Sequence, residues 1–183
     1  MAEPKPFLPV KPVCGIIAAS DEAFREAEAG LEGLLGLVQA RSPRFAFSLT
    51  DYYVAEMGPG LKRGFLSFAG LIEPQRLAGL KLATNALEGE IRRRFASGLR
   101  PVNLDPGYLT KAALIMATAK DFSHRVPLAD GIYAHLEFLF ARNGGIRCLD
   151  WTYPDFLQTG YKAFFLEVRR RYLEELRKTP GAV

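Results

Sequence analysis

Residues 120–125 bring together side chains that could carry acid–base and anion-binding chemistry. Lys120 and Arg125 supply two cations, Asp121 a carboxylate and His124 an imidazole. Lysine offers a phosphate or carboxylate a point charge, and arginine offers a planar fork of donors. An imidazole exchanges protons near neutral pH. We therefore take His124 and Asp121 as candidate catalytic residues and Lys120 and Arg125 as candidate anion ligands; a surface hairpin with paired charges is the structural alternative.

A second polar group follows the start of an expected strand. Asn103 and Asp105 share one face of that strand, and Tyr108 follows three residues later. Pro106 fixes φ and Gly107 tolerates a positive φ, so the sequence predicts a tight turn at 105–107. Asp105 is a third candidate catalytic residue, with an Asx-type turn lock as the alternative, and Asn103 and Tyr108 are candidate ligand-binding residues.

Two further segments complete the candidate site. Lys81 and Asn85 lie one turn apart on a polar stripe of an expected helix, where they can reach the sheet edge and line a pocket. Trp151 and Tyr153 connect the last expected strand to the last helix and offer an aromatic wall for a base or sugar. A hydrophobic plug, with Thr152 or Asp155 capping the helix, is the structural alternative.

Other polar and aromatic positions receive a structural interpretation. His135 lies within an apolar segment and is interpreted as a strand histidine. In the segment Asp51, Tyr52 and Tyr53, period two places the tyrosines on opposite strand faces, so only one of them is expected to face a pocket.

Several familiar mechanisms are excluded by missing motifs. The chain has no GxxxxGK[ST], no GxGxxG after a strand, no HExxH, no GxSxG and no cluster of Cys and His for zinc. Neither histidine belongs to an HxT or HxS pair, which disfavours a two-histidine phosphoesterase. The sequence identifies no cofactor and no metal-ligand set, although Asp105 or Asp121 could hold a metal.

Five ordered segments carry a resemblance to one family. The segments are 81–85, 102–109, 118–125, 131–134 and 151–155. They resemble the bacterial family numbered 4416 among domains of unknown function, and the similarity covers residues 13 to about 166. The resemblance implies no established activity. Some members carry a GTP-binding label, and 103–106 is similar to a phosphate-side motif of one GTPase group, but without a P-loop we do not transfer a GTPase activity.

The helices and strands that hold these side chains can be predicted from the hydrophobic periodicity of the sequence. The sequence predicts strands at 13–19, 44–53 and 61–71 and from 100, with helices from Ser20 to before 42 and from 74 to 98. Further strands are expected at 111–120, 132–142 and 146–150. A terminal helix is expected from 156, with an apolar stripe formed by Tyr161, Phe165, Val168, Tyr172 and Leu176. This order predicts an α/β (α+β) sandwich with a ferredoxin-like βαββαβ core, extra C-terminal strands and a terminal helix.

Length and composition place this scaffold in one domain. The 183 residues divide into a Pro-rich N-terminal arm, 1–12, and a single α/β domain, 13–183. The start of the chain has no apolar signal-peptide region, and no segment is apolar enough to span a membrane, so we expect a cytoplasmic protein. The net charge of +4 permits an anionic partner without requiring one.

Two functions follow as hypotheses. The first is binding of, or action on, a phosphate-bearing small molecule such as a nucleotide, with Lys120 and Arg125 as anion ligands and His124 exchanging a proton. The second is an RNA-binding or assembly module without catalytic activity, in which Tyr52, Tyr53, Trp151 and the basic residues 169–171 share a surface. Whether the protein is an enzyme, and its oligomeric state, stay open.

Overall fold

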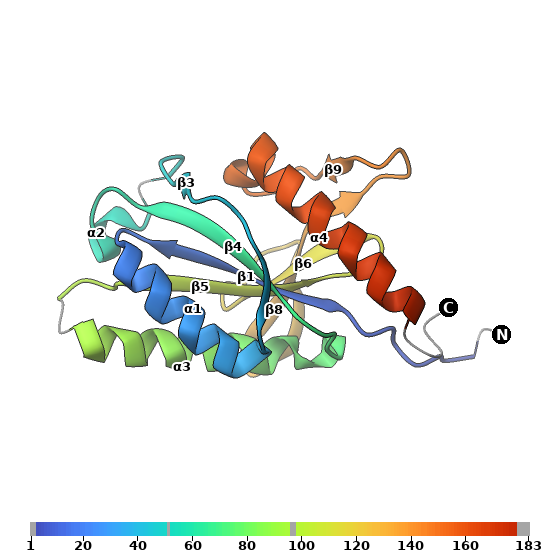
Figure 1. Ribbon diagram of the computed structural model, residues 1–183, viewed down its shortest axis with the longest axis horizontal. Helices are drawn as coiled ribbons and strands as arrows, with labels where there is room; N and C mark the ends of the chain where they lie inside the picture. The colour runs from blue at the N-terminus through green and yellow to red at the C-terminus, as the bar shows by residue number, and fades with distance from the viewer. Residues whose placement is uncertain (1–2, 51, 96–97, 179–183) are drawn as a thin grey trace.

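The computed structural model describes residues 3–50, 52–95 and 98–178, and shows a mixed α+β fold with helices on both faces of one large sheet (Figure 1). The strands are β1 Lys11–Ala18, β2 Val38–Arg41, β3 Phe45–Ala46, β4 Lys62–Phe68, β5 Val102–Leu109, β6 Ala113–Thr118, β7 Val126–Ala129, β8 Ile132–Phe140 and β9 Ile146–Cys148. The helices are α1 Asp21–Leu35, α2 Val54–Met57, α3 Leu77–Phe95 and α4 Thr159–Lys178, with 3₁₀ turns η1 Pro74–Arg76 and η2 Pro154–Leu157.

All strand pairs in the sheet are antiparallel. The nine described strands follow the order β2-β4-β1-β5-β6-β8-β7, while β3 pairs with β4 and β9 with β8. β1 lies between β4 and β5 and is buried along its whole length. A strand covered on both faces needs apolar side chains in both directions, which explains its continuous apolar sequence.

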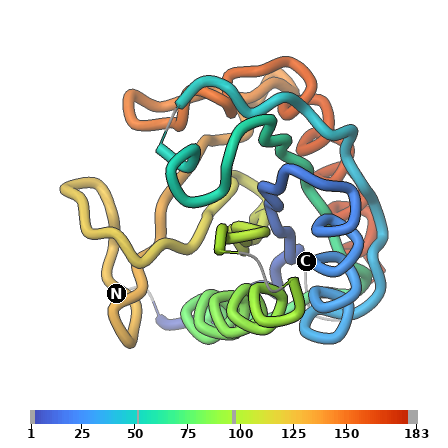
Figure 2. The backbone as a smooth tube through the Cα atoms, turned by 90° about the vertical axis from the view of Figure 1, so that its left-hand side faces the viewer, coloured from blue at the N-terminus to red at the C-terminus, as the bar shows by residue number. Residues whose placement is uncertain are grey.

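One face of the sheet is covered by α1 and α3, which lie side by side (Figures 1 and 2). Ser20 caps α1 by accepting a hydrogen bond from the Ala23 backbone N–H, as its position before two acidic residues predicts. Side chains of both helices pack there on alternate residues of β1, β4 and β5. We call this side the α1–α3 face.

The opposite face, here called the α4 face, is covered in two parts. Phe65 of β4 and Phe138 of β8 pack against aromatic residues of η2 and α4. Ile17 of β1 packs with Phe47 and with Met57 of α2. The cavity described below is lined by residues from both parts.

Helix α4 confirms the predicted apolar stripe of the terminal helix. Its buried side chains include all five predicted ones, Tyr161, Phe165, Val168, Tyr172 and Leu176. Its remaining positions are rich in charge: Glu167 and Glu174 bind Arg170. In the described part of the chain, no helix combines the length and the apolar character needed to cross a bilayer.

The region between α1 and β4 differs from the prediction. The helix was expected to continue through Val38, but it ends at Leu35, where Gly36 adopts a φ of 87°. β2, which the sequence did not predict, begins at Val38. The strand expected at 44–53 is wrong except at β3, because the chain forms a turn and then α2 instead. β7 was also not predicted.

The predicted tight turn at 105–107 is wrong, because these residues lie inside β5. Pro106 fits an extended strand because the β5–β6 pairing begins only at Gly107, one residue beyond it. Gly107 is required by packing rather than by a positive φ. A Cβ at this position would lie 2.6 Å from the Ile115 carbonyl oxygen of the neighbouring strand.

A β-bulge interrupts the pairing of β8 with β6. Ile115 pairs with Leu136 and Leu114 pairs with Phe138, so Glu137 is an extra residue on β8. The bulge allows His135 and Glu137 to line the cavity while Phe138 packs in the core on the same α4 face.

Close contact between α1 and α3 generates a test of the packing. A methyl group at Gly30 would overlap the Leu87 side chain of α3, whereas the same addition at Gly33 meets nothing within 4 Å. We expect Gly30→Ala to lower the free energy of unfolding by about 1–3 kcal/mol. Gly33→Ala should raise it by up to about 1 kcal/mol, because alanine favours helix. Urea denaturation measures both; equal effects of the two changes would contradict the packing.

Candidate ligand-binding site

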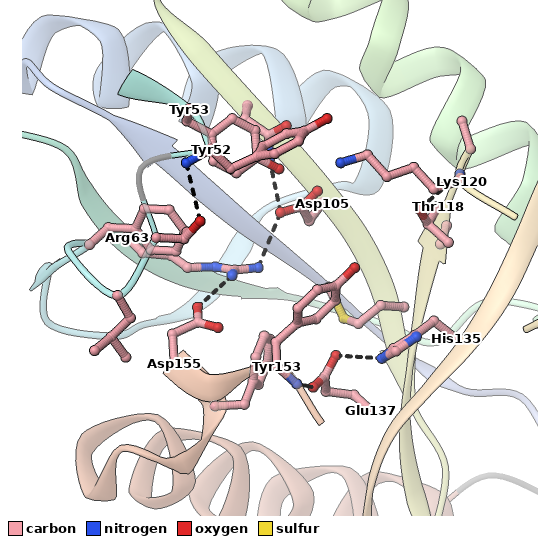
Figure 3. Close-up of a pocket in the computed structure, with 18 of the residues that line it drawn as sticks. Tyr52, Tyr53, Arg63, Asp105, Thr118, Lys120, His135, Glu137, Tyr153 and Asp155 are labelled. Carbon is pink, nitrogen blue, oxygen red and sulfur yellow. Dashed lines mark hydrogen bonds and ion pairs between the residues drawn. The ribbon is translucent and has the colours of Figure 1, made fainter. Parts of the chain in front are cut away.

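A cavity of about 590 Å³ opens on the α4 face (Figure 3). Strands β4, β5, β6 and β8, the segment before α2 and the segment around η2 contribute to it. Helix α3, which covers the other face, contributes Lys81 and Asn85, because β5 and β6 pair only at 107–109 and leave the first half of β5 open toward α3. Its aromatic lining consists of Phe47, Tyr52, Tyr53, Tyr153 and Phe156. Its charged and amide side chains are Glu56, Arg63, Lys81, Asn85, Arg100, Asn103, Asp105, Lys120, His135, Glu137 and Asp155.

A buried guanidinium forms one wall of the cavity. Arg63 of β4 is 6% exposed and donates from Nη1 to Asp155 Oδ2 at 2.6 Å and from Nη2 to Asp105 Oδ2 at 3.1 Å. The side chain reaches β5 across Gly15 of β1, where a Cβ would lie 3.3 Å from Nη2. Burial opposes the charge of Arg63, but the two carboxylates raise its pKa above the ordinary value, so it stays charged.

The carboxylate of Asp105 is held by several neighbours. Besides Arg63, Asn103 donates from Nδ2 to Oδ2 at 2.9 Å. The Lys81 ammonium lies 3.8 Å from Oδ1 and donates to the Leu104 carbonyl at 2.7 Å. Asp105 and Asn103, two residues apart on β5, therefore share the α4 face as predicted.

Arg100 and Glu88 form hydrogen bonds with Asn103 and Leu104, the residues that precede Asp105 on β5. Arg100 donates to Asn103 Oδ1 at 2.7 Å and also to the Glu88 carboxylate. The other Glu88 oxygen accepts from the Leu104 backbone N–H at 2.7 Å. Burial raises the pKa of Glu88, an effect that Arg100 opposes.

An imidazole and a carboxylate form the opposite wall. His135 and Glu137 of β8 are 2% and 0% exposed, and His135 Nε2 lies 3.0 Å from Glu137 Oε2. The Tyr153 backbone N–H donates to Glu137 Oε1 at 2.8 Å. On its other side, His135 Nδ1 lies 3.1 Å from His124 Nε2. His135, interpreted from the sequence as a strand histidine, thus lies in a strand and also lines the cavity.

His124 contacts the cavity wall without lining the cavity. Its ring stacks on Trp151 with an interplanar angle of 8°, and the Trp151 indole donates to the Leu136 carbonyl at 2.8 Å. The neighbouring Arg125 donates to the Tyr153 hydroxyl and to the Lys120 carbonyl, each at 2.7 Å. These bonds fix the position of two residues that do line the cavity.

The predicted site residues therefore separate into three groups. The cavity brings together Lys81, Asn85, Asn103, Asp105, Lys120 and Tyr153. His124, Arg125 and Trp151 touch residues of its wall from outside. Asp121 is exposed and does not line the cavity, and Tyr108 lies on the α1–α3 face, so neither belongs with the others.

Several residues of the site were missed or given another role. Arg63 and Glu137 were overlooked, and Asp155, considered as a helix cap, binds Arg63 instead. The available signal was a charge within or beside an apolar strand segment, Glu137 in β8 and Arg63 before Phe65–Phe68 in β4, since such a charge needs a buried partner. Tyr52 and Tyr53 both line the cavity because they enter the turn before α2. Asp51 lies outside the described residues.

The arginines of the terminal helix are engaged in contacts of their own. Arg169 donates to the Lys111 carbonyl, and Arg170 and Arg171 both bind Glu167. Within the described ranges, no three or more His, Cys, Asp or Glu side chains are grouped so that they could hold a metal ion.

The buried ion pair yields a stability prediction. Asp155→Asn removes one of the two charges that balance Arg63, and breaking a buried pair costs about 3 kcal/mol. We expect a loss of that size in urea denaturation, against a change within about 0.5 kcal/mol for the exposed control Asp121→Asn. Equal stabilities of the two variants would contradict the role of Asp155.

The histidine contact yields a pH prediction. Loss of solvent contact and the neighbouring His135 and Arg125 lower the pKa of His124. The folded state then binds this proton more weakly than the unfolded state, so stability falls as the pH drops from about 7.5 to about 5.5. His124→Gln should show a smaller fall than the native chain over this range. If the urea midpoints of His124→Gln and the native chain fell equally over this pH range, the result would argue against a lowered pKa of His124.

Comparison with known proteins gives one match. No curated protein and no solved structure matches the chain. A family model described as "Domain of unknown function (DUF4416)" matches residues 8–172, which include every cavity residue named above. The chain therefore belongs to this family.

Proposed function

We propose that the chain binds a phosphate-bearing small molecule, such as a nucleotide, in the cavity on the α4 face. The volume of about 590 Å³ lies in the range of small-molecule sites, which are usually apolar with a few well-placed polar groups. The aromatic rings that line it offer surfaces for a planar group, such as a base.

The position of Lys120 carries the proposal. Three of the four cations that line the cavity bind carboxylates: Arg63, Lys81 and Arg100. The Lys120 ammonium instead lies 3.7 Å from the centroid of the Tyr52 ring, and among the described residues it has no carboxylate within ion-pair distance. An exposed ammonium that none of the described carboxylates neutralises, at the edge of an aromatic cavity, suits a phosphate group.

Proton transfer in this site, as we propose it, belongs to His135 and Glu137 rather than to His124. Both line the cavity, whereas His124 reaches it only through His135. His135 Nδ1 lies 3.1 Å from His124 Nε2 and accepts a hydrogen bond from Arg125 Nε at 3.4 Å, and its Nε2 lies 3.0 Å from Glu137 Oε2.

We further propose a ferredoxin-like core and a cytosolic setting. The antiparallel order β2-β4-β1-β5, with α1 and α3 on one face, supports this proposed core. Both cysteines are free thiols, as is usual in a reducing compartment.

A ligand screen tests the proposed function. We expect some members of a panel of nucleoside mono-, di- and triphosphates, sugar phosphates and inorganic phosphate to raise the melting temperature of the native chain. Lys120→Ala should weaken the affinity of the best probe about tenfold or more in calorimetry. Lys62→Ala, which changes an exposed lysine outside the cavity, should bind like the native chain. Lack of any shift, or native affinity in Lys120→Ala, would overturn the proposal.

A further inference from the structure

The two oxygens of Asp105 have different surroundings. Oδ2 accepts hydrogen bonds from Arg63 and Asn103, which fix the orientation of the carboxylate. Among the described residues none donates a hydrogen bond to Oδ1; Lys81 Nζ, at 3.8 Å, is too far away. Because the Asp105 side chain is 23% exposed and lines the cavity, Oδ1 is a positioned acceptor that a ligand can reach.

The charges around Asp105 indicate which ligand group can bind there. Arg63 and Lys81 supply two positive charges, and Asp105 and Asp155 supply two negative charges. A cationic ligand group is therefore not needed for balance. A phosphate oxygen would face the lone pairs of a carboxylate, so this wall is unsuited to the phosphate end of the ligand. The group that fits is a neutral hydrogen-bond donor.

The position of Lys81 indicates that the ligand group also accepts a hydrogen bond. Its ammonium uses one of three protons on the Leu104 carbonyl, and it lines the cavity beside Asp105. An acceptor, Oδ1, and a donor, Nζ, thus lie 3.8 Å apart in the same wall. A hydroxyl can donate to the first and accept from the second, whereas an N–H group can only donate.

We propose that Asp105 and Lys81 form a hydroxyl-binding subsite, and that the molecule bound in the cavity is a phosphate ester carrying a sugar. This inference rests on the proposed function, because it assumes that the phosphate lies at Lys120. Its sugar hydroxyls bind at β5 and α3, and the aromatic rings contact its less polar surface.

Matched pairs of ligands test the subsite. The probes are the four ribonucleoside monophosphates with their 2′,3′-dideoxy counterparts, together with ribose 5-phosphate and phenyl phosphate, which carries no hydroxyl on its ring. Calorimetry should show that the native chain binds at least one hydroxylated probe about 10- to 100-fold more tightly than its hydroxyl-free counterpart, as expected for hydrogen bonds to charged groups.

Substitutions at Asp105 and Lys81 test whether these two residues cause the preference for hydroxylated probes. Asp105→Asn and Lys81→Met should each bring the affinity ratio of the matched probes close to one, while Asp121→Asn, outside the cavity, should keep the native ratio. Because both probes are measured on the same preparation, a partly unfolded fraction does not change the ratio. Thermal unfolding of each variant without ligand reports its fold separately.

The outcomes separate the two proposals. If no phosphate-bearing probe binds, the proposed function fails and this inference fails with it. If the probes bind but the hydroxylated and hydroxyl-free forms have equal affinity, or if Asp105→Asn keeps the native ratio, only the hydroxyl subsite is overturned.

Discussion

A single buried charge organises this protein. The Arg63 guanidinium lies on the central part of the sheet, among the rings of Phe47, Phe65 and Phe156, where an uncompensated charge would be very costly. Two carboxylates balance it, one from β5 and one from η2. The segment between β9 and α4 is thereby tied to Arg63, 92 residues away, and through it to Asp105, 50 residues away, and the same contacts orient Asp105 in the cavity.

Helices and strands are predicted well where one hydrophobic pattern continues along the whole segment. β1, β4, α3 and the apolar stripe of α4 follow their hydrophobic patterns closely. The prediction fails over much of residues 36–50 and 52–57: Phe47 and Tyr53 lie outside strands and pack beside Ile17 and Met57, so the alternation of aromatic residues is a false period of two. It fails again at 105–107, because proline and glycine indicate turns locally, whereas here packing between strands determines the structure.

Only part of the candidate site could be predicted from the sequence, because the site combines residues of polar segments with charged residues inside apolar strands. Polar residues in short polar segments, such as Asp105 after Asn103 and Lys120 after the end of β6, stand out because such segments often carry function. Arg63 and Glu137 are hidden inside apolar strands, and their partners come from distant segments. Only the assembled sheet shows that these charges face a common cavity. The basic run of α4, which dominates the C-terminal sequence, is largely neutralised by neighbouring glutamates.

The β-bulge at Glu137 has a consequence for how this strand can change over evolutionary time. Before the bulge the α4 face of β8 carries the polar His135, and after it the same face carries the aromatic residues Phe138 and Phe140. The extra residue lets the part of β8 before the bulge and the part after it both direct these side chains to the α4 face. Loss of one residue here would turn either the histidine or the phenylalanines to the wrong side. Insertions and deletions in β8 should therefore be far rarer than substitutions, and the length of this strand is a more stringent signature of the fold than most of its side chains.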